Sequence, residues 1–294
     1  MAGTRTVTEL IALLLSSPVV FKAPDAIGER FTGLADRDMH VLEVPQWQGS
    51  GAPTARRLAE GAALLAGMVP YGTRLRVPVD EESSVDGIAA SVRSMLPPGP
   101  VLTVGGDCSV DLVPVARAVS QYGARLKVFW FDAHGDLNTP ESSPSGAFHG
   151  MVLRTLTGTG PASLVPDTLL DPERIVLAGV RDLDPGEQAY VASSGITHLR
   201  DTSGLESALA PGDVAYIHID LDVLDPGVFS SVGTPAPGGL QPGELLDAVA
   251  AIASVAEVVG MAITEYEPSS AADQELLVPL VRGLTSAFAA SKKS

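Results

Sequence analysis

Two of the most apolar segments of the chain run directly into clusters of acidic and imidazole side chains, and this feature constrains the fold most strongly. Leu126–Phe131 is followed by the sequence DAHGD, and Val214–Ile219 is followed by DLD. Short apolar runs of this kind predict buried β-strands. The two polar motifs are therefore expected at the ends of two buried strands, next to the apolar interior.

The spacing within these motifs predicts a metal site. Alternate residues of a strand share one face, so we expect Asp132, His134 and Asp136 to point the same way, and Asp220 and Asp222 likewise. Carboxylates brought together at the ends of buried strands repel each other unless a cation lies between them. Hard oxygen ligands with one or two nitrogens suit Mn²⁺, and bridging oxygens suit a pair of ions. The alternative is that these acids lie in solvated loops, which the preceding apolar runs disfavour.

The rest of the chain alternates short apolar segments with amphipathic ones. The expected strands are Met39–Val44, Val101–Val104, Leu126–Phe131, Ile175–Ala178, Val214–Ile219 and Val258–Ile263. The expected helices are Thr54–Gly67, Val85–Met95, Val110–Tyr122, Glu187–Ser193, Gly243–Ala256 and Gln274–Ala290. This alternation predicts one α/β domain over residues 1–294, a three-layer α/β/α sandwich with a mainly parallel sheet. Ligands of such sheets bind beyond the carboxyl ends of the strands.

Composition limits the possible partners. The chain has 35 acidic and 19 basic residues and a formal charge of −16, which disfavours nucleic acid and anionic membranes as partners and favours small cationic or zwitterionic molecules. Its single cysteine, Cys108, excludes an intrachain disulfide framework. The most apolar long stretch, Leu245–Ile263, contains Asp247 and Glu257 and is not expected to span a membrane. Met1–Pro18 lacks the layout of a signal peptide, so we expect a cytoplasmic protein.

Five motifs in order, between Val101 and Pro268, resemble those of the ureohydrolases, the family of arginase, agmatinase and their relatives. They are GGDCS, FDAHGDLNTP, SGAFHG, IDLDVLDP and TEYEP. The segments DLNTPESSPSG and GVRDLDPGE are most similar to arginase itself. The resemblance implies metal-dependent hydrolysis of a guanidino compound to urea and an amine, with L-arginine as the first candidate. It also implies a homo-oligomer, a trimer or a hexamer.

The resemblance further implies which residues hold two Mn²⁺ ions. Asp132 and Asp220 correspond to carboxylates that bridge the ions, His134 and Asp222 complete one site, and Asp136 belongs to the other. Two divalent cations that share a water lower its pKa from 15.7 to about 7, which supplies a nucleophile for the unreactive guanidinium carbon.

Cys108 stands where the family motif GGDHS has a histidine ligand. It could ligate as a thiolate and favour a softer ion such as zinc or iron, or stand aside and leave a weak site. The chain could also be a one-metal or non-catalytic relative with a binding or regulatory role, and the thiol could simply be a small buried apolar group. We expect Cys108 to weaken the site without abolishing it, so that Cys108→His raises Mn²⁺ affinity and hydrolysis.

The remaining site residues also follow from the resemblance. Glu265 matches the carboxylate that pairs with the guanidinium. His149 matches the histidine that transfers protons, and it or Asp136 would pass a proton to the leaving amine. Positions that match substrate contacts are Asn138 and Ser145 for the α-carboxylate, Asp184 and Glu187 for the α-amino group, and Thr234 near the guanidinium.

Two positions complicate this assignment. Ala147 stands where arginases commonly carry an asparagine that contacts the substrate carboxylate, so another guanidino acid, or a formimino acid, is an alternative substrate. Losing such a hydrogen bond costs about 1.5–3 kcal/mol. His218 shares its expected strand face with Asp220 and Asp222. We expect it to orient a carboxylate or to be a buried histidine, rather than to bind metal directly.

Overall fold

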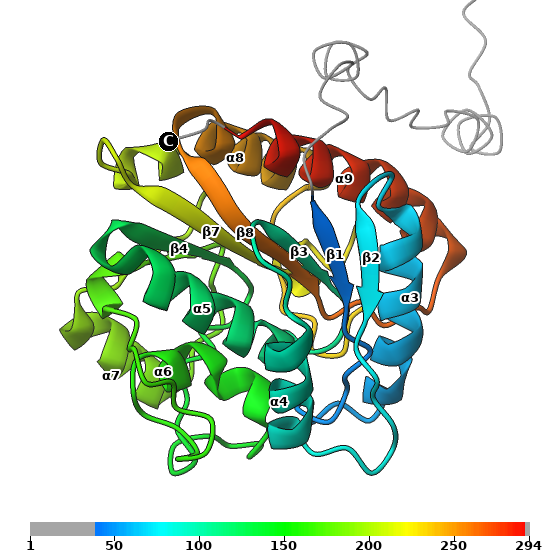
Figure 1. Ribbon diagram of the computed structural model, residues 1–294, viewed down its shortest axis with the longest axis horizontal. Coiled ribbons are helices and arrows are strands. Elements are labelled where there is room, and N and C mark those ends of the chain that lie inside the picture. Colours follow the sequence, from blue (N-terminus) through cyan, green and yellow to red (C-terminus); the bar gives the residue numbers. More distant parts are fainter. Residues whose placement is uncertain (1–38, 292–294) are drawn as a thin grey trace, which may run out of the picture. The chain divides into compact units, whose positions relative to one another are not determined.

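The computed structural model describes residues 39–291, which build one sheet covered by helices (Figure 1). The sheet has eight strands in the order β2-β1-β3-β8-β7-β4-β5-β6, and all paired strands are parallel. The strands are β1 (His40–Glu43), β2 (Thr73–Arg76), β3 (Val101–Val104), β4 (Leu126–Phe131), β5 (Ile175–Ala178), β6 (Thr197–Leu199), β7 (Val214–Asp220) and β8 (Glu257–Thr264). Met1–Pro18, where we expect no signal peptide, lies outside the described residues.

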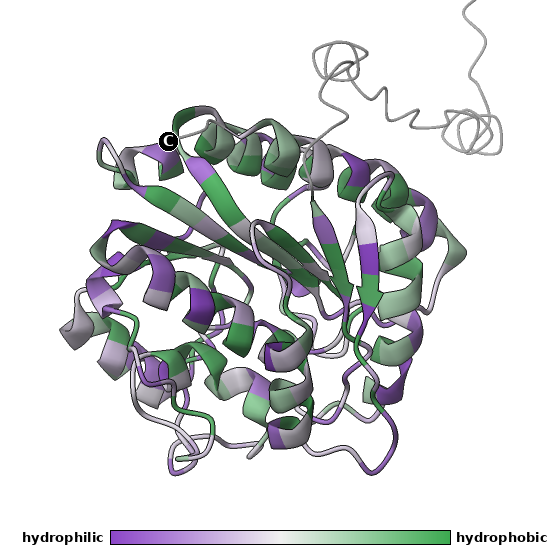
Figure 2. Ribbon diagram, in the orientation of Figure 1, coloured by the Kyte–Doolittle hydropathy of each residue, from purple (hydrophilic) through white to green (hydrophobic). Residues whose placement is uncertain are grey.

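Helices cover both faces of the sheet and confirm the predicted three-layer α/β/α sandwich (Figure 1). They are α3 (Leu58–Met68), α4 (Val85–Met95), α5 (Leu112–Tyr122), α6 (Val152–Leu156), α7 (Pro185–Ser194), α8 (Pro242–Val255) and α9 (Ala271–Ala290). One core lies between the sheet and α3, α8 and α9, and the other between the sheet and α4, α5 and α6. The strands at the centre of the sheet are mostly hydrophobic (Figure 2). This fits their position, because β4 and β7 are buried on both faces between the helical layers.

The structure corrects several expected boundaries. Strands β2 and β6 were not predicted, because they lie at the two edges of the sheet and carry polar, partly exposed residues instead of an apolar run. Helix α9 begins at Ala271, one turn before the expected Gln274, because the Ser270 side chain accepts a hydrogen bond from Asp273 N and caps it. The short helix α6 was also not predicted. Within residues 39–291, no helix has the length and apolarity needed to cross a membrane.

The loop after β3 depends on glycine. Gly105 and Gly106 both have φ of +81°, in the region that side chains disfavour. A Cβ atom on Gly105 would lie only 2.1 Å from the Cβ of Ala62 in α3. The tight turn lets the chain enter a 3₁₀ helix, Cys108–Asp111, which precedes α5 and carries the cysteine into the site. The helix expected to begin at Val110 therefore begins as this 3₁₀ turn.

Candidate metal centre and active-site cavity

The DAHGD motif forms a turn instead of an extension of the strand. Strand β4 ends at Phe131, and Asp136 has φ of +50°, so the expected strand alternation from Asp132 to Asp136 is wrong. The turn is closed by side chains of the motif itself, because Asp132 Oδ1 accepts a hydrogen bond of 2.6 Å from His134 N. Asp220, the last residue of β7, accepts one of 2.7 Å from Asp222 N in the same way.

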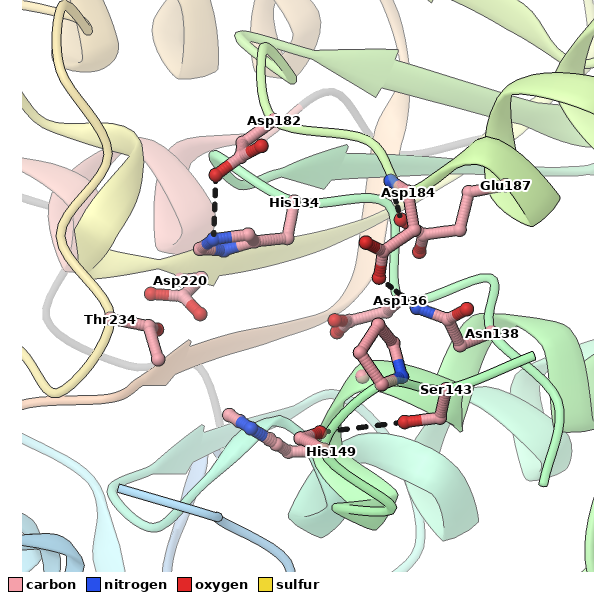
Figure 3. A pocket seen from close by; sticks show the side chains of 13 residues that line it. His134, Asp136, Asn138, Ser143, His149, Asp182, Asp184, Glu187, Asp220 and Thr234 are labelled. Atoms are coloured by element: carbon pink, nitrogen blue, oxygen red, sulfur yellow. Dashed lines mark hydrogen bonds and ion pairs between the residues drawn. The ribbon is translucent and has the colours of Figure 1, made fainter. Parts of the chain in front are cut away.

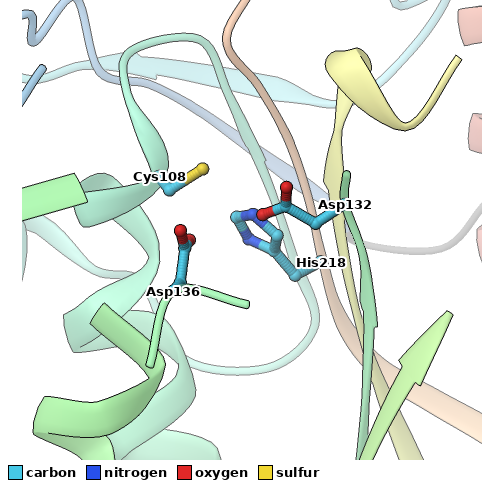
Figure 4. Close-up of side chains that lie close together, drawn as sticks. All are labelled: Cys108, Asp132, Asp136 and His218. Atoms are coloured by element: carbon cyan, nitrogen blue, oxygen red, sulfur yellow. The ribbon is translucent and has the colours of Figure 1, made fainter. Parts of the chain in front are cut away.

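These turns bring the expected metal ligands together in overlapping groups. Asp132, His134 and Asp222 each offer a ligand atom within 4.8 Å of the others, and so do Cys108, Asp132, Asp136 and His218 (Figure 4). A third group joins Cys108 to Asp220 and Glu265. Asp132 belongs to two of the groups, which fits its expected position between two ions.

The electrostatics of the cluster favour a cation. Burial, and then repulsion by a neighbouring carboxylate, raise the pKa of Asp132, Asp136 and Asp220. Burial opposes the charged form of His134, but its contacts with Asp132 and Asp222 outweigh this and raise its pKa. A divalent cation would stabilise these carboxylates in their charged form.

One orphaned atom supports the same conclusion. Asp136 is only 4% exposed, and its Oδ2 atom has no hydrogen-bond partner among the described residues. A buried carboxylate oxygen without a partner costs free energy unless it binds a metal ion or a proton. The oxygen- and nitrogen-rich ligands of this cluster fit Mn²⁺ or a similar ion.

Cys108 is buried at the centre of the cluster. Its Sγ atom lies 3.1 Å from Asp220 Oδ2 and 3.7 Å from Thr264 Oγ1. Burial, followed by repulsion from Asp220 and other carboxylates, raises the pKa of the Cys108 thiol well above its usual value. In this arrangement the Cys108 thiol donates a hydrogen bond to Asp220 Oδ2.

Glu265 and His149, two expected catalytic residues, form an ion pair of 3.0 Å between Oε1 and Nδ1. Glu265 is 1% exposed, has φ of +61°, and also accepts a hydrogen bond from Cys108 N. Burial alone would lower the pKa of His149, but the adjacent Glu265 carboxylate raises it to about 9. The imidazole is therefore charged at neutral pH.

A cavity of about 290 Å³ opens beside the cluster (Figure 3). It is lined by His134, Asp136, Asn138, Ser143, Pro144, Ser145, His149, Gly150, Asp182, Asp184, Glu187, Asp220 and Thr234. Most of the expected site residues thus meet at one cavity. The others do not line it: Cys108, Asp132, Asp222 and Glu265 are buried behind its wall.

The expected substrate contacts hold one another in place. Asn138 Nδ2 donates to Asp184 Oδ2 at 2.8 Å (Figure 3). Glu187 accepts hydrogen bonds from Leu137 N and Asp184 N. Both carboxylate oxygens of Glu187 are therefore engaged at the start of α7, and its contact with substrate stays a prediction.

Thr234 and Ser145 lie at other parts of the wall. Thr234 Oγ1 donates to Asp222 Oδ2 at 3.2 Å, so it also orients an expected metal ligand. The exposed Ser145 contacts Ser143 Oγ at 3.4 Å. Ser143 was not predicted, because nothing in its motif distinguishes it from its neighbours.

Asp182 and Arg181, which follow β5, were also not predicted. Asp182 Oδ2 lies 4.0 Å from His134 Nε2 across the mouth of the cavity (Figure 3). Arg181 donates to several backbone carbonyl oxygens, including those of Asp222, Ala236 and Pro237. Arg181 and Asp182 directly follow an expected strand. Their position at a strand end could have identified both as site residues.

These features define a class of protein: a parallel α/β sandwich with a cluster of carboxylates and histidines at the carboxyl ends of its strands. The model of the Arginase family matches residues 23–290, and the chain belongs to this family. Both the expected ureohydrolase resemblance and the expected fold are thereby confirmed.

Individual relatives agree with this assignment. Arginase from Staphylococcus aureus (strain MRSA252) is 37% identical over 182 residues, which cover 57% of this chain and 60% of the relative. Arginase from Bacillus subtilis (strain 168) is 40% identical over 154 residues, covering 47% and 52%. The chain thus spans between half and two thirds of the length of these curated relatives.

Solved structures match over more of their length. The arginase structure from Bacillus caldovelox has a TM-score of 0.75 and 26% identity, covering 88% of this chain and 100% of that chain. The structure of arginase from Bacillus subtilis has a TM-score of 0.74 and 27% identity, covering 85% and 98%.

Proposed function

We propose that this protein is a metal-dependent ureohydrolase that converts a guanidino compound to urea and an amine, with L-arginine to L-ornithine as the first candidate. The observation that carries the proposal is the position of Asp132, which belongs to two ligand groups beside an acidic cavity. The names of the curated relatives, arginase in each case, support this substrate class.

The metal ions would be held by residues of the two strand ends. Asp132, His134 and Asp222 would hold one ion, and Asp132 and Asp136 would contribute to the other. Asp220 would bridge the two ions, as the resemblance implies. Mn²⁺ suits these oxygen and nitrogen ligands. When bound, a pair of divalent cations supplies the nucleophile by lowering the pKa of a shared water to about 7.

The charge of the cavity supports a cationic substrate. Its lining contains five carboxylate residues and no lysine or arginine. Glu265, the predicted partner of the guanidinium, is buried behind the cavity wall and paired with His149, so it would contact a planar guanidinium only after His149 moved aside. Because Glu265 is paired with His149 before substrate binds, the guanidinium and His149 would compete for one carboxylate.

This competition would activate His149 as an acid. The pKa of His149 is about 9 beside Glu265, so the imidazole carries a proton at neutral pH. A guanidinium that neutralises Glu265 would remove the negative charge that stabilises protonated His149. The pKa of His149 would then fall, and its proton would be easier to release. His149 would then deliver its proton to the leaving amine.

The far end of the cavity suits an amino acid. Asn138, Ser143 and Ser145 are neutral donors for a carboxylate, and Asp184 is a carboxylate for an ammonium group. Ala147 has no polar side chain to add to these donors. A second guanidino acid with a different spacing of its end groups is therefore the alternative substrate, with a formimino acid as the further one.

The test is urea release from L-arginine after incubation with Mn²⁺, beside a panel of other guanidino acids, agmatine and formimino acids assayed for formamide. Asp136→Asn should remove activity, while His198→Gln, a histidine on the edge strand β6, should retain it. Failure of the Mn²⁺-loaded protein to release urea or formamide from any compound would refute the proposal. We also expect a cytoplasmic homo-oligomer, a trimer or hexamer by light scattering, that binds no nucleic acid.

A further inference from the structure

His218 is a fully buried imidazole in the middle of β7, with 0% exposure. Its Nδ1 atom lies 2.9 Å from Asp111 Oδ2, and Asp111 also accepts a hydrogen bond from the Tyr216 hydroxyl. An ionised carboxylate can only accept, so Nδ1 carries the hydrogen. In the neutral ring this leaves Nε2 with a free lone pair, the arrangement typical of a histidine that binds a metal ion.

Trp130 fixes the plane of this ring. The two rings stack with centroids 3.5 Å apart and an angle of 7° between their planes. The same Trp130 donates a hydrogen bond of 3.1 Å from Nε1 to Asp132 Oδ2. One indole thus orients both His218 and Asp132, the residue expected to bridge two ions.

The Nε2 atom of His218 has only a weak protein partner. Thr264 Oγ1 lies 3.5 Å away, at the limit of hydrogen bonding, and the Thr264 hydroxyl can donate to Ile219 O at 3.3 Å instead. A buried nitrogen with a lone pair is therefore poorly satisfied by the hydrogen bonds of the described residues.

The position of His218 completes a ligand set. Its ring offers a nitrogen within 4.8 Å of ligand atoms of Cys108, Asp132 and Asp136 (Figure 4). Ligand atoms around one ion, each roughly 2.0–2.3 Å from it, lie at most roughly 4.6 Å apart, so small adjustments suffice. Independently, the orphaned and buried Oδ2 atom of Asp136 indicates that this group lacks a positive partner.

We propose that His218 binds, through Nε2, the metal ion held by Asp132 and Asp136. It would supply from β7 the nitrogen ligand that the family motif places at position 108. The proposal rests on the metal centre of the proposed function and adds a ligand to it. It reverses two expectations from the sequence. His218 was not expected to bind metal directly, and Cys108→His was expected to raise Mn²⁺ affinity, whereas it would now add a second imidazole to the site.

The test measures metal binding by the full-length protein, without reference to activity. Metal-free wild type, His218→Gln and the control His198→Gln are titrated with Mn²⁺ and followed by electron paramagnetic resonance, with bound metal counted by mass spectrometry. We expect two sites in wild type and the control, and one site weakened at least about tenfold in His218→Gln. Two sites of wild-type affinity in His218→Gln would overturn the proposal.

A second measurement covers the case in which His218→Gln does not fold. In a His134→Ala variant, pulsed electron paramagnetic resonance of the remaining bound Mn²⁺ should still detect a directly bound nitrogen. Absence of that signal would overturn the proposal. Failure of wild type to bind any Mn²⁺ would instead refute the metal centre of the proposed function.

Discussion

The ion pair between His149 and Glu265 predicts a large change in the pKa of one histidine. Replacement of Glu265 by glutamine keeps the shape of the side chain and an oxygen to accept the hydrogen bond from Cys108 N, but removes the charge. The pKa of His149 is about 9 with the carboxylate in place, against an ordinary value of 6.5. In Glu265→Gln it should fall towards or below that ordinary value, because burial then acts with less opposition.

The magnitude follows from the size of this shift. A rise from 6.5 to about 9 corresponds to about 3 kcal/mol of preference for the charged imidazole. Because the folded-state pKa is raised, this stabilisation is fully present below pH 6.5 and is lost as the pH rises through about 9. The stability difference between wild type and Glu265→Gln should therefore shrink over the same pH interval.

The assay is a pH titration of the imidazole nitrogens of the metal-free protein by nuclear magnetic resonance. The signal of His198, whose Nε2 lies 2.9 Å from Val180 O, serves as the internal reference in both proteins. Asp107 and Asp132 also favour the charged form of His149. A fall of less than one unit in Glu265→Gln would mean that these two acids carry the effect, which would refute the assignment to Glu265.

Three further substitutions test the surroundings of the metal centre. Trp130→Phe keeps the stacked ring but removes the hydrogen bond to Asp132, so Mn²⁺ affinity measured by titration should fall about tenfold. Arg181→Met removes several hydrogen bonds to backbone carbonyl oxygens and should lower the free energy of unfolding by about 3 kcal/mol in urea denaturation. Cys108→His should change Mn²⁺ affinity less than about threefold if His218 already supplies a nitrogen; a gain of tenfold or more would show that the site lacks an imidazole.

The central part of the fold was predictable because its strands are uniformly apolar. Strands β3, β4 and β5 lie at the predicted residues. Each is buried on both faces, and its sequence is therefore a continuous apolar run. The edge strands β2 and β6 could not be found in the same way. Their residues are polar and partly exposed. They form strands because their backbone groups pair with those of the neighbouring strands, β1 for β2 and β5 for β6.

The location of the candidate site was also predictable, since polar motifs that follow parallel strands meet at one edge of the sheet. The conformation within the motifs was not. The positive φ of Asp136 turns its carboxylate into the cluster, and this depends on the fit of the whole turn. The partnership of His218 with Asp111 was equally hidden, because it joins β7 to the 3₁₀ helix after β3, and sequence patterns do not give the order of strands.

The strand order brings residues 108 and 218 to one place. Strand β8 separates β3 from β7, and it ends in Thr264, a residue small enough to contact both Cys108 Sγ at 3.7 Å and His218 Nε2 at 3.5 Å. Side chains from positions 108 and 218 therefore reach the same point from opposite sides. A metal ion responds to the donor atoms around it and not to the strand that carries them. If His218 binds the ion, a histidine at both positions would place two imidazoles where the structure holds one imidazole and one thiol.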